Sequence, residues 1–364
     1  MIAYGEWIER WERRLAAKDR GKVPRPFAWG WDWLRATPVN RLPARPAGLA
    51  DLVAWNQRVL ADSAAFFSAP AVREFRLRDG WLTFPSPVST PFAENNTVYA
   101  RWFAADTRFS GRLHRFRAVP AAAGRAAAPT RRRAVVVLPQ WNASESGHVS
   151  LCRLLARCGV AALRLSLPYH DRRRPAGLAR AEFPVDPNLG RTIHAARQAV
   201  CDVRAALDWL EGEGYDRLGV LGTSLGSCYA FLATAHDPRL RVNVFNHVAD
   251  FFGDVVWTGL TTGHVRASVA GELDQSGLRE AWRVISPASY YGRMEGADKR
   301  NLLLCARHDL SFLPAFSRRV LAEFRQRGIQ FEAHWLACGH YTVGQPPFSF
   351  LDAFYMTRFL CAQL

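Results

Sequence analysis

The chain has 364 residues, of which 49% are hydrophobic, so it can bury a large core and is too apolar to be disordered. Its net charge is +16, but all except three of its 48 basic residues are arginine, and alanine is also abundant. This pattern favours a compositional bias over a dedicated nucleic-acid surface, so we expect no specific nucleic-acid partner; nonspecific binding through the arginine excess is the alternative.

The sequence predicts a protein of the cytoplasm. It has no run of about 20 apolar residues, and residues 1–7 lack the charged and apolar regions of a signal peptide. The seven cysteines are odd in number and scattered, without a C-x-x-C pair. They are therefore expected to be reduced thiols that are mostly buried.

Residues 1–70 are predicted to form a helical, aromatic-rich extension, and residues 71–364 the main domain. Trp7, Trp11 and Leu15 recur at helical spacing, and four aromatic residues follow within residues 27–34. We expect these aromatics to pack against the main domain, with peripheral membrane contact as the alternative. The sequence predicts neither the role of this extension nor the oligomeric state.

The main domain is predicted to be an α/β fold with a mostly parallel central sheet flanked by helices. Residues 72–84 and 97–118 alternate like antiparallel edge strands, and residues 119–130 form an Ala/Pro/Gly-rich linker. From Arg133 onward short apolar runs alternate with helical patterns, which is typical of a parallel sheet covered by helices. The expected strands are residues 134–138, 161–167, 217–221, 240–245, 301–306 and 330–336.

Three helices are expected between and after these strands, over residues 193–210, 313–324 and 348–362, each with an apolar face at helical spacing. Between residues 249 and 291 the alternation lapses and several apolar residues gather. We therefore expect a lid insertion at about residues 250–291, over the carboxyl edge of the sheet.

The run G-T-S-L-G at residues 222–226 follows a predicted strand directly and precedes a predicted helix. This is the setting of a nucleophile elbow, in which a serine is held in a strained turn between strand and helix. The glycines two positions away allow the strand and the helix to approach closely. Ser224 is therefore the candidate nucleophile.

A serine nucleophile needs a general base, and the base needs an orienting carboxylate. Asp309 follows the predicted strand 301–306, and His340 follows the predicted strand 330–336, so both would emerge at the same edge of the sheet as Ser224. Asp309 could instead cap a helix, in which case Asp250 is the alternative carboxylate. His308 is expected to pack or to line the site rather than to act as a second base.

Two main-chain N–H groups should bind the oxyanion of the tetrahedral intermediate. The residue after the nucleophile, Leu225, supplies one, and the loop after the first parallel strand supplies the other, through Trp141 or else Gln140.

These residues resemble the α/β-hydrolase superfamily over residues 133–364. The loop at residues 168–173, Pro-Tyr-His-Asp-Arg-Arg, is similar to a Pro-Tyr-x-x-Arg-Arg loop in poorly characterised abhydrolase-domain proteins. The resemblance implies a triad of Ser224, Asp309 and His340 that hydrolyses carboxylic esters without a cofactor. One departure is that Pro139 and Gln140 replace the common His-Gly pair before the oxyanion residue.

The predicted function is hydrolysis of a small-molecule ester through an acyl-enzyme. A thioesterase, an acyltransferase or a serine peptidase with the same triad is an alternative, and so is a catalytically silent scaffold that binds a partner or a membrane. No H-E-x-x-H or dinucleotide motif occurs, so we expect neither a metal nor a cofactor. The apolar lid suggests an acyl or aromatic ester. The arginines of residues 172–174 are interpreted as a solvated loop that could meet an anionic group.

Overall fold

A nine-stranded sheet organises the chain, in the order β1-β2-β3-β5-β4-β6-β7-β8-β9. The computed structural model describes residues 3–19, 21–39, 42–106 and 131–364. The predicted linker 119–130, and the predicted strand 97–118 from residue 107 onward, lie outside the described residues. The strands are β1 (Arg76–Arg78), β2 (Trp81–Pro85), β3 (Thr97–Phe103), β4 (Arg133–Leu138), β5 (Ala161–Leu165), β6 (Arg217–Thr223), β7 (Leu240–Asn246), β8 (Arg300–Ala306) and β9 (Phe331–Leu336).

The six strands from β4 to β9 pair in parallel. The strands β4 and β5, in the middle of the sheet, consist mainly of Val, Leu and Ala, because a parallel strand covered by helices is buried on both faces. All six strands predicted after residue 133 are confirmed, with ends that differ by two residues at most.

The remaining strands form an antiparallel edge, in which β1 pairs with β2, β2 with β3, and β3 with β5. The turn between β1 and β2 consists of Asp79 and Gly80, both with positive φ (51° and 74°), as a two-residue hairpin of this type requires. The predicted antiparallel edge is therefore confirmed, but residues 72–75 lie outside it, residues 76–85 form two strands joined by a turn, and β3 ends at Phe103.

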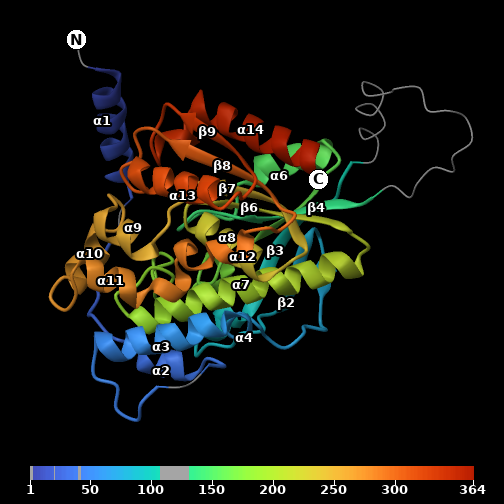
Figure 1. The fold of residues 1–364 in the computed structure, drawn as a ribbon. Helices are drawn as coiled ribbons and strands as arrows, with labels where there is room; N and C mark the ends of the chain where they lie inside the picture. The colour runs from blue at the N-terminus through green and yellow to red at the C-terminus, as the bar shows by residue number, and fades with distance from the viewer. Residues whose placement is uncertain (1–2, 20, 40–41, 107–130) are drawn as a thin grey trace, which may run out of the picture.

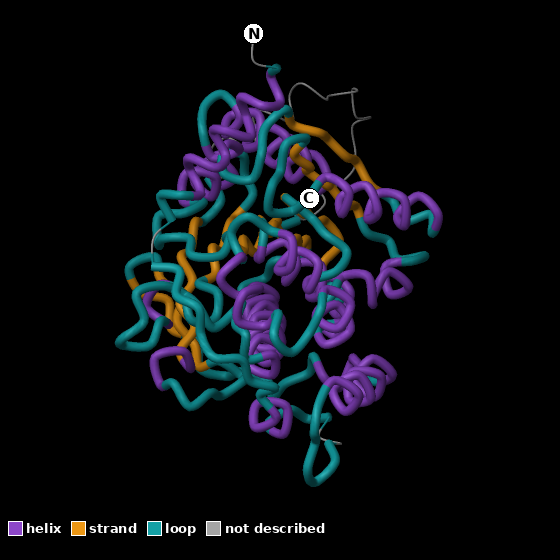
Figure 2. The backbone as a smooth tube through the Cα atoms, turned by 90° about the vertical axis from the view of Figure 1, so that its left-hand side faces the viewer, coloured by secondary structure: helices purple, strands orange, loops and turns teal. Residues whose placement is uncertain are grey.

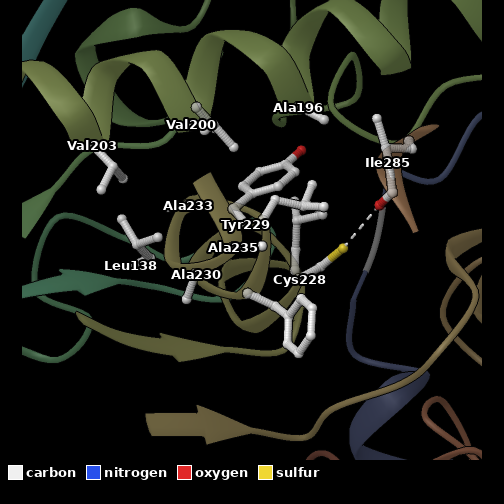
Figure 3. Packing of buried hydrophobic residues seen from close by; sticks show 14 of the residues in the cluster. Leu138, Ala196, Val200, Val203, Cys228, Tyr229, Ala230, Ala233, Ala235 and Ile285 are labelled. Carbon is white, nitrogen blue, oxygen red and sulfur yellow. Dashed lines mark hydrogen bonds between the residues drawn. The ribbon is translucent and has the colours of Figure 1, made fainter. Parts of the chain in front are cut away.

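Helices cover both faces of the sheet, and Figures 1 and 2 show the strands as a middle layer. α6 and α14 pack on one face, whereas α7, α8 and α13 pack on the other, and α3 packs against α11 rather than on the sheet. Figure 3 shows side chains of α8 lying between α7 and the strands, with the Cys228 thiol donating to the Ile285 carbonyl. These helices are α3 (Leu49–Ala61), α6 (Val149–Arg157), α7 (Leu189–Gly212), α8 (Leu225–His236), α13 (Pro314–Gln326) and α14 (Phe348–Gln363).

The N-terminal helices pack against this domain. Trp33 and Leu34 are buried, and Trp29 and Trp31 lie against the main core, so the expected packing of this aromatic cluster is confirmed. Trp7 is 44% exposed. The other helices of the described residues are α1 (Tyr4–Ala16), α2 (Trp31–Arg35), α4 (Ser63–Phe66), α9 (Phe252–Thr258), α10 (Gly263–Val269), α11 (Gln275–Ala281) and α12 (Tyr291–Met294).

Residues 250–291 fold into α9, α10, α11 and short 3-10 turns, which replace the strand-and-helix alternation of the rest of the domain. Figure 1 shows these helices at the same end of the sheet as α1. Within the described part of the chain, no helix combines the length and the apolarity needed to cross a bilayer.

The interpretation of residues 172–174 as a solvated loop is wrong for Arg173. Its side chain is fully buried and forms an ion pair of 2.8 Å with Asp202 on α7. It also donates to the main-chain oxygens of Asn95 and Ser166, both at 2.9 Å. Arg173 therefore fixes the loop to the domain and is not free to meet an anionic ligand. Arg172 is exposed and pairs with Glu145.

Candidate active site

Ser224 lies in a sharp turn between β6 and α8, with φ 57° and ψ −119°. A non-glycine residue rarely adopts this backbone conformation, and such strain gathers at functional sites. A Cβ atom at Gly222 would lie 2.1 Å from the Gly226 oxygen, and one at Gly226 would lie 2.2 Å from the Leu138 oxygen. Strand, turn and helix approach so closely that both positions require glycine.

The structure brings together the three residues that the sequence analysis selected. The Ser224 hydroxyl oxygen lies 2.9 Å from Nε2 of His340, and Nδ1 of His340 lies 2.9 Å from Oδ2 of Asp309. They follow the carboxyl ends of β6, β9 and β8, which meet at one edge of the sheet. Because Nδ1 donates to the carboxylate, Nε2 is free to accept the serine proton.

Asp309 divides its two oxygens between the histidine and its own loop. Oδ1 accepts from the main-chain N–H groups of Ser311 and Phe312, both at 2.7 Å, whereas Oδ2 faces His340. It does not cap α13, because that helix begins later, at Pro314.

The other candidates from the sequence lie elsewhere. The Asp250 carboxylate accepts from Arg319 at 2.9 Å, so it is engaged in a different ion pair. The ring of His308 packs edge-on against Tyr4, with centroids 5.8 Å apart. His308 is therefore a packing residue that contacts α1.

His247, which the sequence analysis did not select, is a second histidine on Asp309. It follows β7 directly with φ 57°, and its Nδ1 lies 2.9 Å from Oδ2 of Asp309. The side chain is buried, and its Nε2 atom has no hydrogen-bond partner among the described residues. Its position immediately after a parallel strand was the available signal, since such residues meet at the ligand-binding edge.

The charges of this cluster shift its pKa values in different directions. Burial favours the neutral form of Asp309, but His340 and His247 outweigh burial and hold its pKa below the usual range. Burial alone would lower the pKa of His340, yet Asp309 and Glu12 raise it above its usual value. Burial lowers the pKa of His247. Asp309 is thus the anion of the cluster, and His340 is its more basic histidine.

His247, Asp309 and His340 also have the side-chain types and the spacing of a metal site, with ligand atoms within 4.8 Å of one another. In this arrangement, however, both Nδ1 atoms point at one carboxylate oxygen and donate protons to it. A histidine ligand must present a lone pair to the ion, so the geometry is that of a hydrogen-bonded chain.

The loop after β4 borders the serine. Gln140 and Trp141 line the same cavity as Ser224. The main-chain N–H of Asn142 donates to Nε2 of the buried His170 at 3.0 Å, and the Trp141 indole donates to the carbonyl oxygen of Ala181. The loop is therefore held in place from both sides, and His170 belongs to the Pro-Tyr-x-x-Arg-Arg-like loop.

Leu225 is the first residue of α8, so its main-chain N–H has no acceptor in a preceding helical turn. This N–H group lies at the positive end of the helix, directly after the serine. It has the position and the polarity of a donor to a developing oxyanion.

Two cavities meet at Ser224. The larger, of about 620 Å³, includes His340 and His247 and has polar walls such as Arg180 and Asn142. The smaller, of about 40 Å³, is enclosed by mostly apolar side chains. Those side chains are Leu225, Cys228, Phe252, Val255, Val256 and Pro287.

No protein-family model matches the chain. In fold it is similar to an acetyl xylan esterase from Paenibacillus sp., with 13% identity, 91% of this chain and 99% of that chain covered, and a TM-score of 0.56. Acetyl xylan esterase 1 from Thermoanaerobacterium sp. is also similar, with 13% identity, 96% and 98% covered, and a TM-score of 0.54. An acylaminoacyl peptidase from Pyrococcus horikoshii matches with 11% identity, 80% and 55% covered, and a TM-score of 0.51.

The chain has the α/β-hydrolase fold, as these likenesses and the sheet order show. This confirms the fold class that the sequence predicted, with a mostly parallel central sheet between helices.

Proposed function

We propose that the protein is a serine hydrolase that cleaves carboxylic esters, with Ser224 as nucleophile, His340 as general base and Asp309 as the orienting carboxylate. The observation that carries the proposal is the continuous chain of two 2.9 Å hydrogen bonds from Ser224 through His340 to Asp309. It lies at a strained strand-to-helix turn, in the fold that acetyl xylan esterases also have.

The reaction follows from this arrangement. His340 takes the proton of Ser224 through Nε2, and the serine oxygen attacks the ester carbonyl. The N–H groups of Leu225 and of Trp141, or else Gln140, stabilise the oxyanion. His340 then donates the proton to the leaving alcohol. A water molecule, deprotonated by His340, attacks the acyl-enzyme, and the acid leaves as Ser224 regains its proton.

We assign the two halves of the ester to the two cavities. His340 lines the large polar cavity and must reach the leaving oxygen to protonate it, so the alcohol occupies that cavity. The acyl group then enters the small apolar cavity beside Leu225. This cavity, of about 40 Å³, is far smaller than the polar cavity of about 620 Å³. The substrate is therefore an ester of a short acyl chain with a larger polar alcohol.

Residues 250–291 act as the lid of this acyl cavity. Phe252, Val255 and Val256 on α9 and Pro287 in the following turn contribute much of its apolar wall. An apolar wall at this position keeps water away from the acyl chain and limits its length. The aromatic ester that the sequence also suggested fits this cavity less well than a short aliphatic chain, because of its volume.

A panel of para-nitrophenyl esters from acetate to palmitate tests the proposal on wild type and Ser224→Ala. We expect acetate or butyrate to exceed octanoate in kcat/KM by at least about tenfold, because each methylene that does not fit costs about 1–3 kcal/mol. Ser224→Ala should be inactive and should not react with a fluorophosphonate probe. Equal labelling of wild type and Ser224→Ala would refute the catalytic assignment, and a preference for long chains would refute the acyl cavity.

A further inference from the structure

Glu12 is a fully buried glutamate on α1, more than 300 residues from the loop that it contacts. Its Oε1 accepts from the main-chain N–H groups of Tyr341, at 3.0 Å, and Thr342, at 2.6 Å. Its Oε2 lies 2.9 Å from the same Tyr341 nitrogen. Burying a carboxylate is costly unless hydrogen bonds from strong donors compensate, and here two main-chain amides provide them.

The loop that receives Glu12 is the loop that carries His340. A Cβ atom at Gly339 would lie between 2.4 and 2.6 Å from the Glu12 side chain, so the carboxylate reaches the loop only because residue 339 is glycine. The Gly339 N–H donates to the Thr342 hydroxyl at 2.8 Å. His340 therefore sits between two residues whose main chain is held by fixed hydrogen bonds.

Other residues of the same segment anchor α1 to this loop. The Tyr4 hydroxyl donates to the carbonyl oxygen of Ala337 at 2.6 Å. Ile8 is buried in a cluster with residues of β8, β9 and the loop. Asp19 accepts from the Tyr341 hydroxyl at 3.5 Å and pairs with Arg180 at 2.9 Å. The contact extends along the whole helix, so the carboxylate is held in one position.

We propose that Glu12 is a positioning residue for His340, fixing the histidine loop through its main chain and adding a second negative charge beside that loop. This inference rests on the proposed function of His340 as general base. When His340 takes the serine proton it becomes a cation, and a fixed nearby anion stabilises that state. The segment from Tyr4 to Asp19 then supports the active site and is not merely an extension of the fold.

Among the described residues, the ionisable groups around His340 include Asp309 after β8, His247 after β7, Glu12 on α1 and the neighbouring Tyr341. Burial lowers the pKa of His340, whereas Asp309 and Glu12 raise it. Removing the charge of Glu12 should therefore lower the pKa of His340. A residue that served only to hold the fold would leave the titration of a correctly folded protein unchanged.

The test compares Glu12→Gln with Glu6→Gln, which removes an exposed carboxylate from the same helix. The His340 titration is followed by NMR of histidine-labelled full-length protein, with the signal assigned through His340→Gln, and kcat is measured on para-nitrophenyl acetate. We expect a lower His340 pKa and a kcat lower by about tenfold in Glu12→Gln, because a small misplacement of a catalytic group is costly. Glu6→Gln should match wild type in both.

If Glu12→Gln does not fold, Gly339→Ala is measured instead, because its Cβ displaces the carboxylate without removing it. An unchanged His340 titration with kcat within twofold of Glu6→Gln would overturn the proposal. The NMR titration needs no turnover, so it reports on Glu12 even if wild type fails to hydrolyse the ester, an outcome that would count against the proposed function alone.

Discussion

His247 donates a hydrogen bond of 2.9 Å to Asp309, through the same Oδ2 atom that His340 contacts. The carboxylate thus receives two imidazole N–H groups on one oxygen and two main-chain N–H groups on the other. Each donor favours the ionised form and restricts rotation of the side chain. His247 therefore helps to hold the Asp309 carboxylate in place, and Asp309 in turn orients His340, the proposed base.

Replacing His247 should reduce turnover in a way that depends on the substitute. His247→Ala removes a hydrogen bond to a charged group, worth about 1.5–3 kcal/mol, so we expect kcat to fall by about 10- to 100-fold. His247→Asn keeps an N–H donor, and asparagine tolerates the left-handed backbone at this position. Steady-state kinetics on para-nitrophenyl acetate should rank wild type first, then the Asn variant, then the Ala variant. Similar kcat values for the two variants would contradict this role.

The pH dependence of kcat/KM should reflect the raised pKa of His340. His340 must be neutral to accept the Ser224 proton, so activity rises with pH as the imidazole loses its proton. Because its pKa is raised, this rise should be centred above the ordinary histidine value of about 6.5. Rates measured between about pH 5 and 9 give the midpoint. Asp309→Asn removes the charge that raises the pKa of His340 most, so any residual activity of this variant should titrate at lower pH. A wild-type midpoint below the ordinary histidine pKa would disprove the expectation.

Enlarging the acyl cavity should lengthen the preferred chain. Val256 is almost fully buried in its wall, and Val256→Ala removes two methyl groups. We expect the hexanoate-to-acetate ratio of kcat/KM to rise by about tenfold, and the free energy of unfolding to fall by about 2 kcal/mol. Val343→Ala is the matched control, because Val343 is also buried but lines the large cavity. A similar change of chain preference in both variants would show that the cavity assignment is wrong.

The adjacent arginines 172 and 173 should differ sharply in their effect on stability. Arg173→Ala leaves Asp202 buried without its ion-pair partner, so the free energy of unfolding should fall by about 3–5 kcal/mol. Arg172→Ala removes an exposed ion pair and should cost about 1 kcal/mol or less. Urea unfolding of the two variants measures the difference. Combining Arg173→Ala with Asp202→Leu should recover part of the loss, since no unpaired charge is then buried.

The sequence predicted the features that depend on local pattern. The parallel strands are short apolar runs between helical segments, and the turn at Ser224 has its own glycine pattern, so both could be predicted from the sequence. Asp309 and His340 could be selected because parallel strands bring their carboxyl ends to one edge. The order of residues along the chain was sufficient for these inferences.

The sequence did not predict the features that depend on contacts between distant segments. Glu12 lies on a helix with an ordinary amphipathic pattern, and nothing nearby in sequence indicates that its partners are the amides of Tyr341 and Thr342. Arg173 was grouped with its exposed neighbour, because burial of one arginine in a run requires a specific acceptor on α7. The acyl cavity is the space left between α8 and α9, and it exists only once both helices are packed.

The bond from Glu12 to the Tyr341 loop joins residues separated by 329 positions in the chain. During synthesis, α1 leaves the ribosome long before β9 and its loop have been made, and long-range contacts of this kind form late. Until that loop has been made, the carboxylate has neither of the two amides that it binds in the folded structure. The contact between Glu12 and this loop therefore cannot guide the folding of the strands that are made before β9.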